Sequence, residues 1–203
     1  MAQTYDRWAA RYDRRWRRYT DRTHASLLDH LTLARAAAVL DAGCGTGTLL
    51  AQLRRQAPNA QLFGLDASTG MLAQARRSLV GQRIELRFGD ACRLPFPDAA
   101  MDLVILASVL HYLRRPSVAC AEARRVLRPG GTLAIIDYLP RFAHGSVVDG
   151  LIRHYDRGHV RSRPRAELCA ILAHADFKQV EGADFPIGGI FRGVFAKGVV
   201  PLS

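Results

Sequence analysis

Three alternating glycines, Gly43, Gly45 and Gly47, begin two residues after Asp41. Glycines let the backbone turn sharply and approach a ligand closely, and a helix that starts just after them offers unpaired N–H groups. The NAD fingerprint would need a glycine where Thr48 stands, and a phosphate-binding P-loop would need a Gly-Lys-Ser/Thr ending. A purely structural turn is the less favoured alternative, because it would not require three alternating glycines after an acid.

Two further acids, Asp66 and Asp90, stand at or just after the apolar runs 61–66 and 83–88. A carboxylate at the end of the second strand of a parallel sheet can accept hydrogen bonds from both ribose hydroxyls of a nucleoside. Asp90 is placed to accept one from an adenine amino group. Each acid alone could be a turn or helix-capping residue, but together with the glycine loop they indicate a nucleoside-binding edge.

The elements that must position these residues alternate between short apolar runs and helical stretches, which is typical of an α/β fold with βαβ units around a parallel sheet. We expect strands at 37–41, 61–66, 83–88, 101–107 and 132–137, with helices at 48–56, 71–79 and 117–127. Ser68 can cap the second of these helices. Outside this region we expect helices at 3–20, 24–35, 145–156 and 164–174, and strands at 177–185 and 191–197 joined by a turn at 186–189.

The chain of 203 residues carries a net charge of +11, which suits a polyanionic partner such as nucleic acid, an anionic membrane or a phosphorylated substrate. The basic residues are almost all arginines and alanine is abundant, so part of this charge can reflect coding bias. The longest apolar run, 103–113, is too short to span a bilayer, and no signal peptide is visible. The four cysteines lack pairing or zinc-ligand spacing, so we expect reduced thiols, no metal and a cytoplasmic location.

Four segments in order resemble the class I S-adenosylmethionine (SAM)-dependent methyltransferases, most closely their UbiE-like (type 11) branch. They read VLDAGCGTG, LFGLDAS with Met71 following, FGDACRLPFPDAAMDLVI, and RRVLRPGGTLAIID. The resemblance implies a Rossmann-like, doubly wound sheet of seven strands, mostly parallel, with the last strand antiparallel. It implies one domain over 1–203, with an N-terminal helical lid (1–35), a SAM-binding core (36–138), and an acceptor-side segment with a C-terminal hairpin (139–203).

The resemblance also assigns residues to the cofactor by their positions in the family's motifs. These residues are Tyr5, Tyr12, Asp41, Gly43, Gly45, Gly47, Asp66, Ala67, Met71, Asp90, Ala91 and Ala107. Asp66 would hold the ribose, Asp90 and Ala91 would contact adenine, and Asp41 and Ala107 would lie near the methionine end. Tyr5 and Tyr12 would belong to the lid, although their aromatic face could equally be packed against the domain.

A methyl group on a sulfonium is already activated, so the enzyme works mainly by positioning donor and acceptor, and a base helps only where the acceptor must lose a proton. His111 follows the fourth strand and is the best candidate base, with Asp137 and Tyr138 on the fifth strand flanking the same cavity. The alternative for His111 is a helix-face residue with a satisfied ring nitrogen. His154 and His159 are weaker candidates for the acceptor pocket.

The sequence limits the class of methyl acceptor only through motifs that are missing. The residues after the fourth strand lack the D/N-P-P-Y/F motif of amino-methylating DNA enzymes, and no Pro-Cys nucleophile occurs. We expect a small-molecule or lipid-like acceptor, such as a quinone ring or a phosphatidylethanolamine amine, with peripheral contact to an anionic membrane through the aromatic and arginine-rich N-terminal helix. RNA methylation, a NAD-binding oxidoreductase and a non-catalytic SAM-binding protein are the alternatives.

Overall fold

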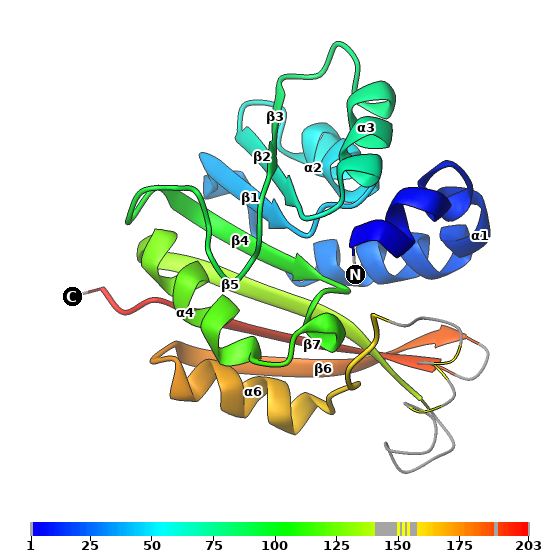
Figure 1. Ribbon diagram of the computed structural model, residues 1–203. Coiled ribbons are helices and arrows are strands. Elements are labelled where there is room, and N and C mark those ends of the chain that lie inside the picture. The colour runs from blue at the N-terminus through cyan, green and yellow to red at the C-terminus, as the bar shows by residue number, and fades with distance from the viewer. Residues whose placement is uncertain are drawn as a thin grey trace.

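A computed structural model describes residues 2–140, 158–188 and 191–202, together with residues 150, 152 and 154. For residues 2–12 and residue 35 it describes only the backbone. Figure 1 shows a twisted sheet with helices packed on both of its faces.

The sheet has seven strands in the order β3-β2-β1-β4-β5-β7-β6. Their bounds are β1 Ala38–Ala42, β2 Gln61–Asp66, β3 Ile84–Phe88, β4 Met101–Ala107, β5 Leu127–Pro140, β6 Lys178–Gly188 and β7 Phe191–Val199. The first five strands pair in parallel, and β7 is antiparallel to both of its neighbours. This confirms the predicted Rossmann-like, doubly wound sheet with an antiparallel last strand. The order reverses direction between β1 and β4, the place where such sheets bind ligands at the carboxyl ends of their strands.

Five helices cover the two faces in the described part of the chain. Helices α1 (Ala2–Asp29), α2 (Thr48–Gln56) and α3 (Thr69–Ser78) bury their apolar residues on one face, and α4 (Pro116–Val126) and α6 (Arg165–His174) bury theirs on the other. Two short 3-10 turns, η1 (Leu33–Arg35) and η2 (Leu110–Tyr112), complete these elements.

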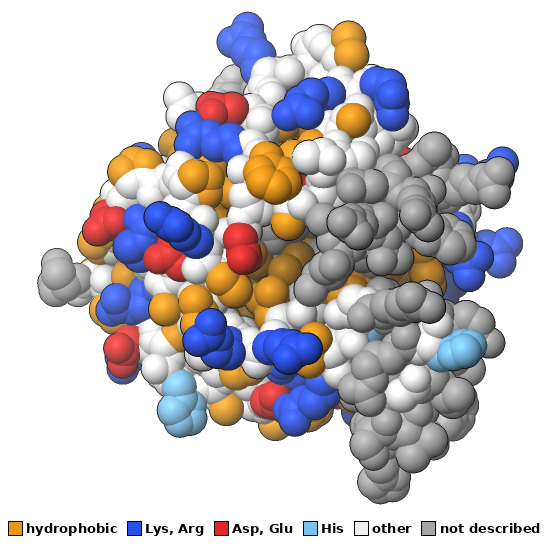
Figure 2. All heavy atoms as spheres, viewed as in Figure 1, with side chains coloured by type: hydrophobic (Ala, Val, Ile, Leu, Met, Phe, Trp, Pro, Cys, Tyr) orange, Lys and Arg blue, Asp and Glu red, His pale blue; other side chains and the backbone are white. Residues whose placement is uncertain are grey.

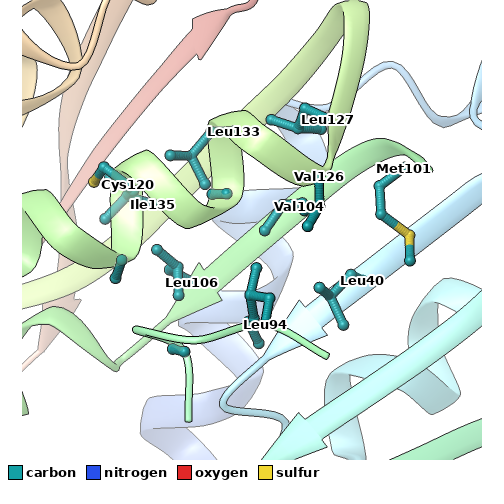
Figure 3. Packing of buried hydrophobic residues seen from close by; sticks show 14 of the residues in the cluster. Leu40, Leu94, Met101, Val104, Leu106, Cys120, Val126, Leu127, Leu133 and Ile135 are labelled. Atoms are coloured by element: carbon teal, nitrogen blue, oxygen red, sulfur yellow. The ribbon is translucent and has the colours of Figure 1, made fainter. Parts of the chain in front are cut away.

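The core lies between the sheet and these helices. In the cluster of Figure 3, Leu40, Val104 and Ile135 from three central strands pack with Cys120 and Val126 of α4. The residue that follows Val104 in β4 belongs to a second buried cluster, which lies on the opposite face of the sheet. Strand β4 is therefore covered on both faces, as its continuous apolar sequence predicts.

The N-terminal region differs from the prediction of two helices, because α1 is continuous from residue 2 to residue 29. Two threonines near its middle return hydrogen bonds to helical carbonyls, with Thr23 Oγ1 donating to Tyr19 O at 2.8 Å and Thr20 donating to Trp16 O and Arg17 O. The polar stretch thus satisfies its own donors without leaving the helix. The predicted end of the second helix is wrong as well, since only the short turn η1 follows residue 32.

The strands near the C-terminus are longer than predicted. Strand β5 already begins at Leu127, which pairs with Met101, so residues 128–131 belong to an irregular start of the strand. Pro186 pairs with Arg192 inside the hairpin rather than in its turn, and residues 189 and 190 lie outside the described residues. The helix expected at 145–156 also falls largely outside them, although residues 150, 152 and 154 are helical.

Candidate functional site

The glycine loop connects β1 to α2 in left-handed backbone conformations. The φ angles are +103° for Gly43, +52° for Gly45 and +81° for Gly47. A Cβ on Gly43 would overlap Val109, and one on Gly47 would lie 2.7 Å from Leu79 Cδ1, whereas one on Gly45 would meet no atom within 4 Å. The loop is therefore closely packed on two sides and open at Gly45, where a ligand can approach the backbone.

Asp66 ties this loop to the start of α3. Its carboxylate accepts hydrogen bonds from Gly45 N and from Ser68 N, both at 2.8 Å. Ser68 in turn caps α3 by accepting from Met71 N at 3.1 Å, as predicted. Met71 is buried below this cap and Ala67 is exposed beside it. The position of Asp66 at the end of β2 fits the predicted contact with a ribose hydroxyl, which stays a prediction.

Asp41 is almost fully buried behind the loop, and its Oδ1 has no hydrogen-bond partner among the described residues. Burial, followed by the charge of Asp66, raises the pKa of Asp41 to about 8. Buried polar atoms in native proteins are normally paired, and a positively charged ligand would complete this one. The orphan carboxylate oxygen and the open space at Gly45 both fit SAM, which carries a sulfonium and an ammonium group.

The remaining cofactor candidates continue along the same sheet edge. Asp90 follows β3 and is exposed, and its Oδ1 accepts from Cys92 N at 2.8 Å, so it does cap a local turn. Ala91 is buried next to it, and Ala107 ends β4 opposite Ile136 of β5. The fold thus brings these candidates to the carboxyl edge of β1–β4, and their contacts with a cofactor stay predictions.

A buried acid–base pair lies on the neighbouring part of that edge. The Nδ1 atom of His111 is 2.7 Å from Asp137 Oδ1, and each side chain is no more than 3% exposed. The same carboxylate accepts from His111 N at 3.1 Å and from Tyr138 N at 2.9 Å. An ionised carboxylate only accepts hydrogen bonds, so Nδ1 of a neutral His111 carries the proton and Nε2 keeps its lone pair.

Aromatic rings surround this pair. Tyr138 Oη lies 3.0 Å from His159 Nδ1, and the Tyr138 ring has edge contacts with Tyr19 at 6.1 Å and with Phe191 at 5.2 Å between centroids. The ring of His111 lies 4.7 Å from that of Tyr138. The structure therefore gathers the three predicted catalytic residues and His159 at one place, whereas His154 is exposed.

Helix α1 joins both halves of the site. Thr46 Oγ1 in the glycine loop donates to Asp13 Oδ1 at 2.6 Å, and Tyr19 Oη lies 2.6 Å from Ser108 Oγ just after β4. No sequence pattern pointed to Ser108, whose φ is +58°. The side chains of Tyr5 and Tyr12 lie outside the described residues.

Comparison with known proteins places this chain in a family. The family description "Methyltransferase domain" (Methyltransf_11) matches residues 40–135. A ubiquinone/menaquinone biosynthesis C-methyltransferase UbiE of Syntrophotalea carbinolica is 30% identical, over 92% of this chain and 89% of the relative. A demethylmenaquinone methyltransferase of Thermus thermophilus is 40% identical over 50% of this chain, and the match covers only 47% of that relative's length.

The chain belongs to the class I SAM-dependent methyltransferases, in their UbiE-like branch. Membership of this family favours SAM as the cofactor over the NAD that an oxidoreductase would need. A solved Haemonchus contortus phosphoethanolamine N-methyltransferase 2 in complex with S-adenosylhomocysteine has the same fold. The two structures match with a TM-score of 0.77 and 17% sequence identity, and the match covers 89% of this chain and 52% of that chain. Among the described residues, no helix is long and apolar enough to cross a membrane.

Proposed function

We propose that the protein methylates a hydroxylated aromatic ring of the quinol type, with His111 as the base. The observation that carries this proposal is the buried His111–Asp137 pair, which aromatic side chains surround beside the glycine loop. Flat rings such as Tyr138 and Phe191 offer edge and face contacts to an aromatic acceptor. One relative is named a demethylmenaquinone methyltransferase and another a ubiquinone/menaquinone biosynthesis C-methyltransferase, and these names support the same acceptor class.

We propose that Asp41, the glycine loop and Asp66 hold the cofactor, with α1 as the cover that Asp13 and Tyr19 fasten. When bound, SAM supplies a methyl group on a positively charged sulfur, which needs no further activation. The Nε2 atom of His111 accepts a proton from an acceptor hydroxyl, which makes the aromatic ring more electron-rich. Asp137 stabilises the resulting imidazolium and keeps the ring orientation fixed. The surrounding rings exclude water from the reacting atoms.

The test is methyl transfer from SAM to a reduced, short-chain demethylmenaquinone, followed by mass spectrometry. The His111→Gln variant should lose about 100-fold in kcat with little change in the KM for SAM, as removal of a general base predicts. His174→Gln is the matched control, because His174 is exposed on α6 and bonds only its own helix at Ala170 O among the described contacts. Turnover of phosphatidylethanolamine or RNA in place of the quinol, or full activity of His111→Gln, would refute the proposal.

We also propose that α1 contacts an anionic membrane surface that holds a lipophilic acceptor. Arg14, Arg15, Arg17 and Arg18 are exposed around Trp16, which is itself 40% exposed. An arginine-rich helix with an exposed tryptophan suits the headgroup region of an anionic bilayer. The same helix delivers Tyr19 to the site, so bound membrane would lie near the acceptor edge. Figure 2 shows that other basic side chains are spread over the visible face of the protein, so the net charge alone does not define this surface.

Vesicle cosedimentation tests the membrane contact. Vesicles rich in phosphatidylglycerol should bind the protein, with binding that weakens as salt rises to a few hundred millimolar. Changing the four arginines to glutamine should abolish it, while the same number of changes at Arg54, Arg76, Arg77 and Arg83 should have a smaller effect. Equal binding to neutral phosphatidylcholine vesicles, or loss of binding in the second variant alone, would contradict the proposal.

A further inference from the structure

The stretch that precedes α6 is attached to the turn that carries His111. Val160 N and Arg161 N both donate to His111 O, at 2.8 and 3.2 Å. The same stretch contains His159, which approaches Tyr138. The main chain of His111 is therefore held from two sides, with its N–H on Asp137 and its carbonyl on residues 160 and 161.

Arg163 strengthens this attachment from inside the protein. Its residue is 6% exposed, and its guanidinium donates to Leu110 O at 2.6 Å and to Leu113 O at 3.0 Å. These two carbonyls belong to the turn on either side of His111. Glu167 in the first turn of α6 lies 3.3 Å from Arg163 Nε, and its carboxylate also pairs with Arg161.

A planar guanidinium can reach two carbonyls in a fixed geometry, and the ammonium of lysine cannot copy that arrangement. A buried charge of this kind is costly, and an apolar side chain of similar size is often as good or better for stability. The contacts of Arg163 on both sides of His111 therefore indicate a role in holding this turn in place, beyond filling the core.

We infer that Arg163 is a positioning residue, which holds the η2 turn so that His111 stays aligned with Asp137 and with the acceptor. This inference rests on the proposed function, because it needs His111 to act as the base. Arg163 itself does not touch the reacting groups. Its effect on the reaction passes through the backbone of Leu110 to Leu113.

A double-mutant cycle with Arg163→Lys and His111→Gln tests the inference, using SAM and a reduced short-chain demethylmenaquinone. Arg163→Lys should lower kcat about tenfold or more, with the KM for SAM and the affinity for S-adenosylhomocysteine within about twofold of the parent. In the His111→Gln background the same change should have almost no further effect, because the base that it positions is already missing. Arg165→Lys is the matched control, since Arg165 is exposed at the start of α6.

The outcomes separate the two ideas. If His111→Gln alone leaves kcat unchanged, the proposed function fails. If His111→Gln lowers kcat but Arg163→Lys lowers it by the same factor with or without His111, the positioning role fails. A merely structural role would lower the melting temperature and S-adenosylhomocysteine binding together and leave kcat per folded molecule unchanged.

Glu167→Gln keeps the inference testable should Arg163→Lys not fold, because it loosens the same anchor while Arg163 stays in place. In the same cycle, a loss of kcat that disappears in the His111→Gln background supports the positioning role. A loss that is equal in both backgrounds, or no loss at all, overturns it.

Discussion

At the scale of single residues, Asp41 behind the glycine loop should make the affinity for SAM depend on pH. Its pKa of about 8 means that the carboxyl group is mostly protonated at neutral pH, because burial and Asp66 disfavour its charge. A cationic ligand beside Asp41 favours the ionised form, so binding of SAM should release a proton. The affinity for SAM should therefore rise between pH 6 and pH 8, by at most roughly tenfold per pH unit, and level off above.

Calorimetry in buffers of different ionisation enthalpy measures this proton release directly. Asp41→Asn is neutral at every pH and should remove the pH dependence, while S-adenosylhomocysteine, which lacks the sulfonium charge, should show a weaker one. A SAM affinity of the parent protein that stays constant from pH 6 to pH 8 would contradict the prediction.

The glycines of the loop provide a second prediction, because they differ in what surrounds them. Gly45→Ala should fold with a loss of about 1–2 kcal/mol for the left-handed backbone, yet bind SAM at least tenfold more weakly, because its Cβ enters the open space. Gly43→Ala should be less stable, since its Cβ overlaps Val109, and Val109→Ala should restore part of that stability. Thermal melts and SAM titrations check both variants. Equal losses of affinity and stability in the two would show that the distinction is wrong.

The sequence predicted the sharp turn at these glycines and the strand-end positions of the acids, because both leave a local pattern. Their contacts with SAM stay a prediction. It could not separate the open Gly45 from the packed Gly43, since that difference depends on Val109, which is distant in the chain. The sequence likewise placed His111 and Asp137 around the same cavity but did not predict that they form a pair. The fold supplies their contact by aligning β5 beside β4.

At the scale of elements, the attachment of α1 to the glycine loop can be tested through Thr46. Thr46→Val keeps the shape of the side chain but removes its hydrogen bond to Asp13. Trypsin should then cleave at the arginines of α1 more readily. The affinity for SAM should fall by about tenfold, which corresponds to about 1.4 kcal/mol, near the lower end for one hydrogen bond to a charged group. Thr20→Val is the control, because Thr20 bonds only within α1 among the described contacts. Unchanged cleavage and affinity would mean that this contact does not hold the helix.

Helix and strand positions in the core were predictable because buried strands and amphipathic helices differ in apolar spacing. The single long α1 was not, since the polar residues near Thr20 and Thr23 resemble a break in the helix and are satisfied within it instead. The stretch 158–164 has no periodic pattern, so the sequence marked His159 only as a weaker candidate and offered no sign that Arg163 reaches the turn that carries His111.

At the scale of the whole molecule, the amino and carboxyl ends of the parallel strands lie on opposite sides of the sheet (Figure 1). We expect residues at the amino ends to affect stability without affecting ligand binding. Asp102 near the amino end of β4 accepts from Ala37 N and Ala38 N at 2.9 and 2.8 Å and pairs with Arg128. Asp102→Ala should lower the free energy of unfolding by about 2 kcal/mol, because it leaves the two N–H groups without their acceptor. SAM affinity of the folded protein should not change. Denaturant unfolding and calorimetry measure the two quantities, and a large loss of affinity would show that the edges are coupled.

The order of the seven strands belongs to this scale as well. Local patterns predicted each strand, but the crossing from β3 back to β4 beside β1 follows only from the resemblance to known methyltransferases. The antiparallel pairing of β5 with β7 joins residues far apart in the chain, such as Tyr138 and Gly193. Such pairings depend on packing of the complete sheet, which short-range spacing does not encode.

Both tryptophans of the chain, Trp8 and Trp16, lie within α1. Intrinsic tryptophan emission is therefore a reporter for this one helix, while far-ultraviolet circular dichroism averages over all helices and strands. A shift of the emission maximum at a denaturant concentration where the dichroism is still native would record detachment of α1 from an intact sheet. Tryptophan fluorescence thus offers a direct measurement of whether α1 acts as the proposed cover.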